Sequence, residues 1–205
     1  MPRAARTAQR RKPRQKRGED TVVVLLDATE RVVAKRGFRA ATTNHIASAA
    51  GVSIGTLYHY FPTKEALMTA VVHRMWQGEL TAVMEHAETF ASAPLADGIR
   101  VVVRALVAEV GRKMALYKYW FTEASQLGEL TTGLAMADQA SAFVRSVLEA
   151  RRTEVRPRDL AFAADLAVKT ALAMARTGAR DYEERVKSGE LAEELADMLT
   201  RYLVA

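Results

Sequence analysis

The sequence predicts an all-α protein, in which an N-terminal three-helix helix-turn-helix domain precedes a larger helical domain. Two short amphipathic helical patterns flank Gly51, over about 43–50 and 53–61, and apolar residues recur at helical spacing through most of the remaining chain. No stretch of useful length alternates between apolar and polar residues as a half-buried strand does. Beyond residue 67 the prolines are Pro94 and Pro157, which leaves room for long helices between and after them.

The composition excludes several classes of function. The chain has no cysteine, which excludes disulfides and thiolate chemistry and fits a cytoplasmic protein. No apolar run approaches the roughly 18 residues of a membrane span, and the basic N-terminus lacks the apolar segment of a secretory signal. The four histidines match no metal-binding spacing, and no catalytic constellation or phosphate-binding glycine loop is present. We therefore expect no enzyme, no metal or other cofactor, and no membrane association.

The stretch over residues 42–67 organises the rest of the chain. Its first helical pattern turns Ile46 inward, and its second turns Leu57 and Phe61 inward at i and i+4. A short connection containing Gly51 joins them, as a sharp turn between two helices requires. This arrangement predicts a helix-turn-helix. The outward face of its second helix is small and polar at its start and aromatic at its end, which suits a DNA major groove.

Several residues around this stretch recur in a specific order and spacing. They are Gly37-Phe38, Ile46-Ala47, Ala49-Ala50-Gly51-Val52-Ser53, Gly55-Thr56-Leu57-Tyr58, Tyr60-Phe61, Lys64-Glu65 and Leu67. Together they resemble the DNA-binding signature of the TetR family of bacterial transcriptional regulators. The family usually has Thr where this chain has Ala41, as the cap of the helix that follows. Thr42 or Thr43 is therefore expected to cap it instead.

The resemblance implies that the second short helix binds DNA. The residues expected to contact base edges are Ser53, Ile54, Gly55, Thr56 and Tyr58, and those expected to contact phosphates are Thr43, His59, Tyr60 and Lys64. Lys64 follows the expected N-cap Thr63, where a cation opposes the helix dipole by a few tenths to about 1 kcal/mol unless an anion binds there. A solvated surface lysine is the alternative.

Positive charge is concentrated at the N-terminus. Residues 1–18 carry eight of the 30 Lys and Arg and no acid, which leaves 22 basic against 24 acidic side chains in residues 19–205. A neutral body with one cationic arm indicates a localised contact. The arm has almost nothing apolar to bury and is expected to be disordered when free. It either follows phosphates or enters the minor groove, or it remains a solvated tail.

The apolar periodicity of the sequence and its Pro and Gly residues predict the remaining helices and the domains. Helices are expected at about 21–36, 65–90, 95–114, 117–126, 129–151, 158–178 and 189–204. The expected domains are a basic arm at 1–18, the helix-turn-helix domain at 19–66, and a helical effector-binding and dimerisation domain at 67–205.

The last two expected helices carry stripes that suit close packing, small residues in the first and large apolar residues in the second. These stripes either close the core of one chain or pair with a second copy. The resemblance implies the second, a homodimer that presents two recognition helices to a palindromic operator on double-stranded DNA. The residues expected at that interface are Ala163, Ala167, Ala171, Met174, Leu195, Leu199 and Tyr202.

The middle of the chain is rich in aromatic and Met side chains. Such residues at helical spacing are more often plain core, whereas the resemblance implies an effector pocket that is apolar with a few polar groups. The residues expected to line that pocket are Trp76, Tyr117, Trp120, Phe121, Phe143 and Phe162.

The leading hypothesis is a dimeric transcriptional regulator, most simply a repressor that a small apolar effector releases from its operator. The alternative is an architectural DNA-coating protein that uses the basic arm without an effector. Such a protein binds random and promoter DNA nearly equally, with an affinity that falls steeply in salt. A helical enzyme is the third hypothesis, and it lacks a catalytic constellation.

Overall fold

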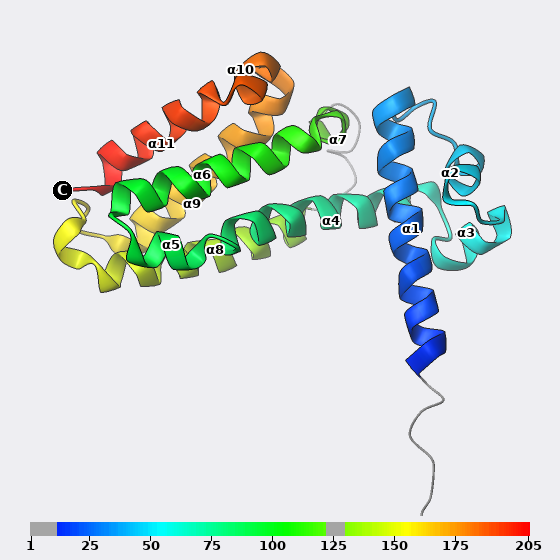
Figure 1. Cartoon of the computed structure of the whole chain (residues 1–205), viewed down its shortest axis with the longest axis horizontal. Helices are drawn as coiled ribbons and strands as arrows, with labels where there is room; N and C mark the ends of the chain where they lie inside the picture. The colour runs from blue at the N-terminus through cyan, green and yellow to red at the C-terminus, as the bar shows by residue number, and fades with distance from the viewer. Residues whose placement is uncertain (1–11, 122–129) are drawn as a thin grey trace, which may run out of the picture. The chain divides into compact units, whose positions relative to one another are not determined.

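A computed structural model of the chain describes the backbone of residues 12–121 and 130–205 and the side chains of residues 18–121 and 135–205. Its helices follow one another in the order (Figure 1) α1 (Lys12–Arg36), α2 (Thr43–Ala50), α3 (Ile54–Tyr60), α4 (Lys64–Met84), α5 (Ala87–Ser92), α6 (Leu95–Arg112), α7 (Met114–Tyr119), α8 (Leu130–Ala150), α9 (Leu160–Asp181), α10 (Glu183–Ser188) and α11 (Glu190–Leu203). A short 3-10 helix, Arg152–Glu154, follows α8. Within the described residues the only β-structure is one isolated bridge, so the all-α class is confirmed. None of the described helices has the length and apolar character needed to cross a bilayer.

The chain divides into two compact units, Met1–Val71 and Val72–Ala205. Helices α1 to α3 belong to the first unit, and α5 to α11 belong to the second. Helix α4 begins in the first unit and continues without a break into the second.

The core of the first unit is formed by α1, α2 and α3, with α1 packed against α2. Leu25 and Val33 of α1 are buried, as are Ile46 of α2 and Leu57 of α3. The periodicity of the sequence predicted the inward positions of Ile46 and Leu57, and burial confirms them. Thr29 is buried as well, and its hydroxyl donates to the backbone oxygen of Leu25 at 2.7 Å.

Helix α1 begins at Lys12, well before the expected start near Thr21. The added turns are rich in Lys, Arg and Gln, which are good helix formers and extend a helix that packing has already nucleated. Residues 12–18 of the arm are therefore helical, in contrast to the disorder expected for them, and residues 1–11 lie outside the described part of the chain.

The core of the second unit lies among α6, α9 and α11, with α8 beside α9 and α11 beside α6 (Figure 1). One face of α9 consists of small residues, which allow neighbouring helices to approach closely. The buried members of this face are Ala163, Ala164, Ala167, Ala171 and Ala175. Gly178 extends it, since a Cβ at that position would lie 2.4 Å from Leu191 Cδ2 of α11.

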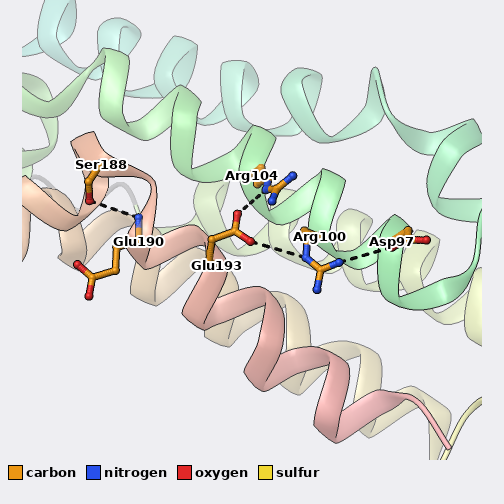
Figure 2. Close-up of polar contacts among 6 residues, drawn as sticks. All are labelled: Asp97, Arg100, Arg104, Ser188, Glu190 and Glu193. Carbon is orange, nitrogen blue, oxygen red and sulfur yellow. Dashed lines mark hydrogen bonds and ion pairs between the residues drawn. The ribbon is translucent and has the colours of Figure 1, made fainter.

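Ion pairs on the surface also join α6 to α11 (Figure 2). Arg104 hydrogen-bonds to Glu193, and Arg100 Nε lies 3.7 Å from Glu193 Oε2. Arg100 also approaches Asp97 Oδ1 at 3.5 Å within α6. All of these side chains are substantially exposed, so each pair contributes only about 0–1 kcal/mol. The buried residues, rather than these pairs, hold the two helices together.

The helix expected from residue 65 to about 90 is interrupted. Helix α4 ends at Met84, and α5 begins at Ala87. The break directs Phe90, which is 2% exposed, against α6, where a Cβ on Gly98 would lie 2.9 Å from Phe90 Cα. No glycine or proline marks the break in the sequence, so tertiary packing rather than local propensity produces it.

Two later helices also differ from the expectation. Helix α10 was not predicted; it ends at Gly189, whose φ of +82° favours glycine. The helix expected over 117–126 begins earlier, at Met114, and its residues 122–126 lie outside the described part of the chain.

Candidate functional site

Thr42 caps the start of α2, and Gly51 ends that helix. The Thr42 hydroxyl accepts a hydrogen bond from His45 N at 3.2 Å, which satisfies one of the amide groups that a helix N-terminus leaves unpaired. Gly51 has a φ of +68°, a left-handed conformation that residues with a side chain rarely adopt. Of the two threonines that the sequence left open, Thr42 is therefore the cap, and Thr43 is the first residue of α2.

Ser53 caps α3 in the same way. Its Oγ accepts a hydrogen bond from Thr56 N at 3.0 Å and lies 2.8 Å from Thr56 Oγ1. Both hydroxyl groups lie at the N-terminal turn of α3, where base contacts are expected from the sequence. One of the two hydroxyl protons is used between them. The pair therefore has one proton left to donate to a base or a phosphate.

The other residues expected at base edges lie on the outside of α3. Ile54 is 38% exposed and Tyr58 is 46% exposed, while Leu57 between them is fully buried. Gly55 is also exposed, and a Cβ there would approach only Ser53 Oγ, at 3.7 Å, among the described residues. This turn of α3 therefore presents apolar and aromatic side chains beside a flat, accessible stretch of backbone.

Three of the residues expected at phosphates lie close to this surface. Thr43 Oγ1 is 3.2 Å from the Tyr58 hydroxyl, which links the start of α2 to α3. His59 is exposed, and its ring packs edge-on against Tyr60 with 5.1 Å between the ring centroids. Tyr60 is half-buried and faces α1, since its hydroxyl lies 3.6 Å from the position of a Cβ on Gly18.

Lys64, the fourth of these residues, is held by the backbone of the first unit. Its Nζ donates to the backbone oxygen of Phe38 at 3.0 Å and lies 3.9 Å from the centroid of the Phe38 ring. The sequence left two alternatives open for Lys64, a phosphate contact and a solvated surface lysine. The structure shows a third arrangement, in which the ammonium group ties the start of α4 to the segment between α1 and α2.

The surroundings of α2 and α3 favour an anionic partner. Residues 31–64 contain five Lys or Arg and no Asp or Glu. The amide groups at the N-terminus of α3 add partial positive charge beside Ser53. A phosphate backbone that approaches this surface therefore meets no carboxylate from these residues.

The second unit contains a cavity of about 100 Å³. Helices α4, α5, α6, α8, α9 and α11 all contribute to its wall. The residues that α4 contributes are Trp76, Glu79, Leu80, Val83 and Met84. Of the described residues that line the cavity, only Glu79 and Arg176 are charged, and nearly all the others are aliphatic, aromatic or Met side chains.

Glu79 and Arg176 form an ion pair at the cavity wall. Arg176 Nη2 donates to Glu79 Oε2 at 2.6 Å, and Arg176 Nε donates to Oε1 at 3.0 Å. Tyr117 also donates its hydroxyl to Glu79 Oε1. Burial and the neighbouring charge of Glu79 raise the pKa of Tyr117 well above its ordinary value, so the phenol remains a proton donor. Burial is the largest single influence on the pKa of Arg176 and lowers it, but the hydrogen bonds to Glu79 and the charges of Glu79 and Tyr117 together outweigh burial, so the pKa is raised.

The aromatic residues expected in a pocket are placed differently from one another. Trp76 and Phe143 line the cavity. Trp120 is not among the residues that line the cavity, but its ring packs edge-on against Trp76 with 5.4 Å between the ring centroids. Tyr117 is completely buried and reaches the cavity only through its hydrogen bond to Glu79.

The remaining two lie away from the cavity. Phe121 packs under the guanidinium group of Arg180, which is 4.9 Å from the centroid of its ring. Phe162 is 63% exposed on the outer face of α9, so the expectation that it lines the pocket is corrected. Sequence reasoning missed the charged pair Glu79 and Arg176. The available signal was that Glu79 lies at i+3 from Trp76, on the inward face of its helix.

The small and apolar stripes of the last long helices are packed inside this chain. The buried residues among those expected at a dimer interface are Ala163, Ala167, Ala171, Leu195 and Leu199, while Met174 and Tyr202 are half-buried. Their packing matches the alternative in which the stripes close the intramolecular core. The same helices expose other apolar residues, namely Phe162 (63%), Leu166 (41%) and Met198 (46%).

Two family descriptions match this chain. Residues 25–71 match the bacterial regulatory proteins of the tetR family, and residues 94–203 match the tetracyclin repressor-like C-terminal domain. The second match alone covers more than half of the chain.

Relatives with a curated description are also helix-turn-helix regulators. An uncharacterised HTH-type transcriptional regulator of Mycobacterium tuberculosis is 52% identical over 50 residues, which cover 24% of this chain and 25% of that protein. The HTH-type transcriptional repressor KstR of Mycolicibacterium smegmatis is 28% identical over 135 residues, which cover 63% of this chain and 64% of that protein. The chain thus spans about a quarter of the length of the first relative and just under two-thirds of the second.

Solved structures share the fold. The TetR family transcriptional regulator PfmR from Thermus thermophilus superimposes with a TM-score of 0.64 at 19% identity, over 88% of this chain and 99% of that one. Because the family's N-terminal description matches the first unit and its C-terminal description covers most of the second, we conclude that this chain belongs to the TetR family of bacterial regulatory proteins.

Proposed function

We propose that this chain is a sequence-specific DNA-binding transcriptional repressor, which acts as a homodimer and leaves a palindromic operator when a small, largely apolar effector binds. The observation that carries the proposal is the exposed N-terminal turn of α3, capped by Ser53 and set in a stretch without acids. Such a turn fits a major groove, because its backbone and short side chains can approach the base edges closely. Action on bacterial DNA would take place in the cytoplasm.

The proposed DNA contacts divide into two groups. Base edges are read by Ser53, Ile54, Gly55, Thr56 and Tyr58, and phosphates are held by Thr43, His59, Tyr60 and Lys64. Lys64 adds its charge beside the phosphates while its hydrogen bond to Phe38 holds the start of α4. The basic arm at 1–18 adds nonspecific contacts to the neighbouring backbone.

The proposed dimer uses the outer faces of α9 and α11. Phe162 and Leu166 lie one turn apart on α9, and Met198 lies on α11. All three are large apolar side chains at least 41% exposed in the single chain. A two-fold pairing of these faces would cover them and give residues 67–205 the dimerisation role proposed for that segment. It would also present two copies of residues 19–66 to the half-sites of a palindrome.

The proposed effector response runs through α4. This helix lines the cavity with Trp76 and Glu79 and carries Lys64, which contacts Phe38, at its other end. A molecule in the cavity that displaces α4 would alter the separation of the two DNA-binding units in the dimer. Because two half-sites must be bound at a fixed spacing, a modest change in that separation releases the operator.

A DNA titration tests the proposal. The purified protein is titrated onto the DNA upstream of its own gene and onto a scrambled sequence of equal length, over a series of salt concentrations. We expect specific binding at least about 10³ tighter than binding to the scrambled DNA. Nearly equal affinities would instead support the architectural alternative, and no binding to either DNA would overturn the proposal.

A further inference from the structure

The part of the cavity wall that the structure describes carries no net charge. Glu79 and Arg176 are the charged groups among the described residues of its wall, and they are paired with each other through hydrogen bonds of 2.6 and 3.0 Å. Glu79 is 2% exposed, so water screens this pair poorly. A second anion or cation placed beside them would lack a counterion, and an unpaired charge is strongly disfavoured in such surroundings.

The hydrogen-bonding capacity of the pair is asymmetric. Both oxygens of Glu79 are occupied, since Oε1 accepts from Tyr117 and from Arg176 Nε, and Oε2 accepts from Arg176 Nη2. Arg176 has a further nitrogen, Nη1, which has no partner among the described residues. Arg176, which lines the cavity, therefore keeps a donor that Glu79 does not use, and neither carboxylate oxygen of Glu79 is unoccupied.

We propose that the cavity selects an uncharged, largely apolar molecule with one hydrogen-bond acceptor, such as a ketone or an ester, whose oxygen accepts from Arg176. This inference rests on the proposed effector role of the cavity and names the chemical class of that effector. The apolar body of the ligand lies against Trp76 and Phe143, and its acceptor oxygen reaches the guanidinium group. An isosteric carboxylate is rejected because Glu79 has already neutralised Arg176.

Four probes of nearly the same shape test this selection by isothermal titration calorimetry at pH 7.5. They are cyclohexyl methyl ketone, cyclohexanecarboxylate, cyclohexylmethylammonium and ethylcyclohexane. In the full-length protein we expect the ketone to bind at least tenfold tighter than each of the other three. Equal binding of the carboxylate and the ketone would overturn the inference. Equal binding of the hydrocarbon would overturn the role of the acceptor, and binding of none of the four would overturn the inference as a whole.

Substitution of Glu79 should reverse the preference between the ketone and the carboxylate. Glu79→Gln keeps an amide oxygen for Arg176 but leaves its charge uncompensated, so we expect the carboxylate to gain at least tenfold and to overtake the ketone. Glu85→Gln, at an exposed position just after α4, is the matched control and should leave both affinities unchanged. An unchanged preference in folded Glu79→Gln would overturn the inference.

Two further variants keep the test decisive. If circular dichroism shows that Glu79→Gln does not fold, the double variant Glu79→Gln/Arg176→Gln restores a neutral wall and should still prefer the ketone over the carboxylate. Loss of that preference would overturn the inference. Ala140→Phe fills the cavity, which Ala140 lines, and should abolish ketone binding. Unchanged ketone binding in Ala140→Phe would place the ligand elsewhere and overturn the inference.

The outcome is separable from that of the proposed function. If the protein binds its operator specifically but does not select among the four probes, the proposed repressor function stands and only the proposed ligand class is wrong. Ketone selection without specific DNA binding would retain the cavity chemistry and remove the repressor.

Discussion

Lys64 Nζ donates a hydrogen bond to the backbone oxygen of Phe38 at 3.0 Å and lies 3.9 Å from the centroid of the Phe38 ring. A cation at the first residue of α4 opposes the helix dipole by a few tenths to about 1 kcal/mol, and these two contacts offset that cost. We expect Lys64→Ala to lower the free energy of unfolding by about 1–2 kcal/mol, because it removes a charged hydrogen-bond donor and a cation–π contact. Urea denaturation followed by circular dichroism measures the change.

Lys35 provides the control for this prediction. It is exposed in the last turn of α1, so Lys35→Ala should change the stability by less than about 0.5 kcal/mol. If Lys64 also neutralises a phosphate, Lys64→Ala reduces the slope of log K against log salt by about one unit for every DNA sequence. An unchanged slope would remove Lys64 from the proposed phosphate contacts and leave its role in the packing of the first unit.

Ser53 and Thr56 are expected to differ although their hydroxyl groups touch. Ser53→Ala removes the cap on Thr56 N and should lower the stability by about 1 kcal/mol, whereas Ser53→Asp keeps a capping oxygen. Thr56→Ala leaves that cap in place, so its stability should be nearly unchanged. It should instead reduce discrimination at one operator base step by about 1–3 kcal/mol. Binding to a panel of single-base operator variants separates the effects, and a uniform loss across the panel would contradict a base-reading role for Thr56.

The helix-turn-helix could be predicted from the sequence because its signals are local. Caps at Thr42 and Ser53, and Gly51 with its positive φ, act within a few residues of the turn that they define. The break between α4 and α5 could not be predicted in this way, since it depends on Phe90 reaching Gly98 of a different helix. Local chemistry therefore identified the helix-turn-helix, and tertiary packing determined the helix boundaries that were missed.

The cavity shows the same limit. The family resemblance implied that Trp76 lines a pocket, and Trp76 does lie in the cavity wall, but a sequence pattern does not say which neighbour an inward residue meets. The pair Glu79 and Arg176 is separated by 97 residues, so only the folded chain brings the two charges together. The alanine face of α9 is a similar case, because small residues suit a close partner helix in the same chain as well as in a second copy.

Acid pH should weaken the contact between α7 and α10. Hydrogen bonds from Lys118 and then Lys187 lower the pKa of Glu183 from about 4.5 to about 2. Because the folded-state pKa is the lower one, this stabilisation is fully present above about pH 4.5 and is lost as the pH falls toward 2. We expect Glu183→Gln to show a smaller fall in its urea midpoint between pH 5 and pH 3 than the unmodified chain.

Glu88 provides the comparison for that prediction. It is exposed in α5 and has no ion-pair partner among the described residues, so Glu88→Gln should retain the pH dependence of the unmodified chain. The difference is expected to be modest, because the Lys118 and Glu183 side chains are exposed to solvent by 42% and 36%. If the urea midpoint falls equally between pH 5 and pH 3 in both variants, the pair of Lys118 and Glu183 does not contribute to acid sensitivity.

The exposed apolar face of α9 predicts a change in oligomeric state. Leu166→Glu places a charge at a position that is 41% exposed in the single chain, so the fold should be retained. In a dimer built on this face the charge would be buried without a partner, and we expect monomers by sedimentation velocity. Ala108→Glu introduces the same charge at an exposed position of α6 and should leave the association unchanged. A Leu166→Glu variant that remains dimeric would show that α9 does not form the interface.

The buried pair of Glu79 and Arg176 predicts strongly non-additive stability. Glu79→Leu leaves the Arg176 guanidinium group without its carboxylate and should lower the free energy of unfolding by about 3 kcal/mol, near the lower end for buried pairs because the Arg176 side chain is 19% exposed. Arg176→Leu should have a similar effect on Glu79. The double variant Glu79→Leu/Arg176→Leu should be less destabilised than either single variant, because no unpaired charge remains.

The exposed pair of Asp165 and Lys169, at i and i+4 in α9, is the control for that cycle. Lys169 Nζ and Asp165 Oδ2 are 2.6 Å apart, but both side chains are well exposed. The coupling energy of this pair should therefore be no more than about 0.5 kcal/mol. Additive effects at Glu79 and Arg176 would show that water or another group already compensates each charge. A large coupling would instead show that this pair holds α4 and α9 together at the cavity wall, the connection that the proposed effector would disturb.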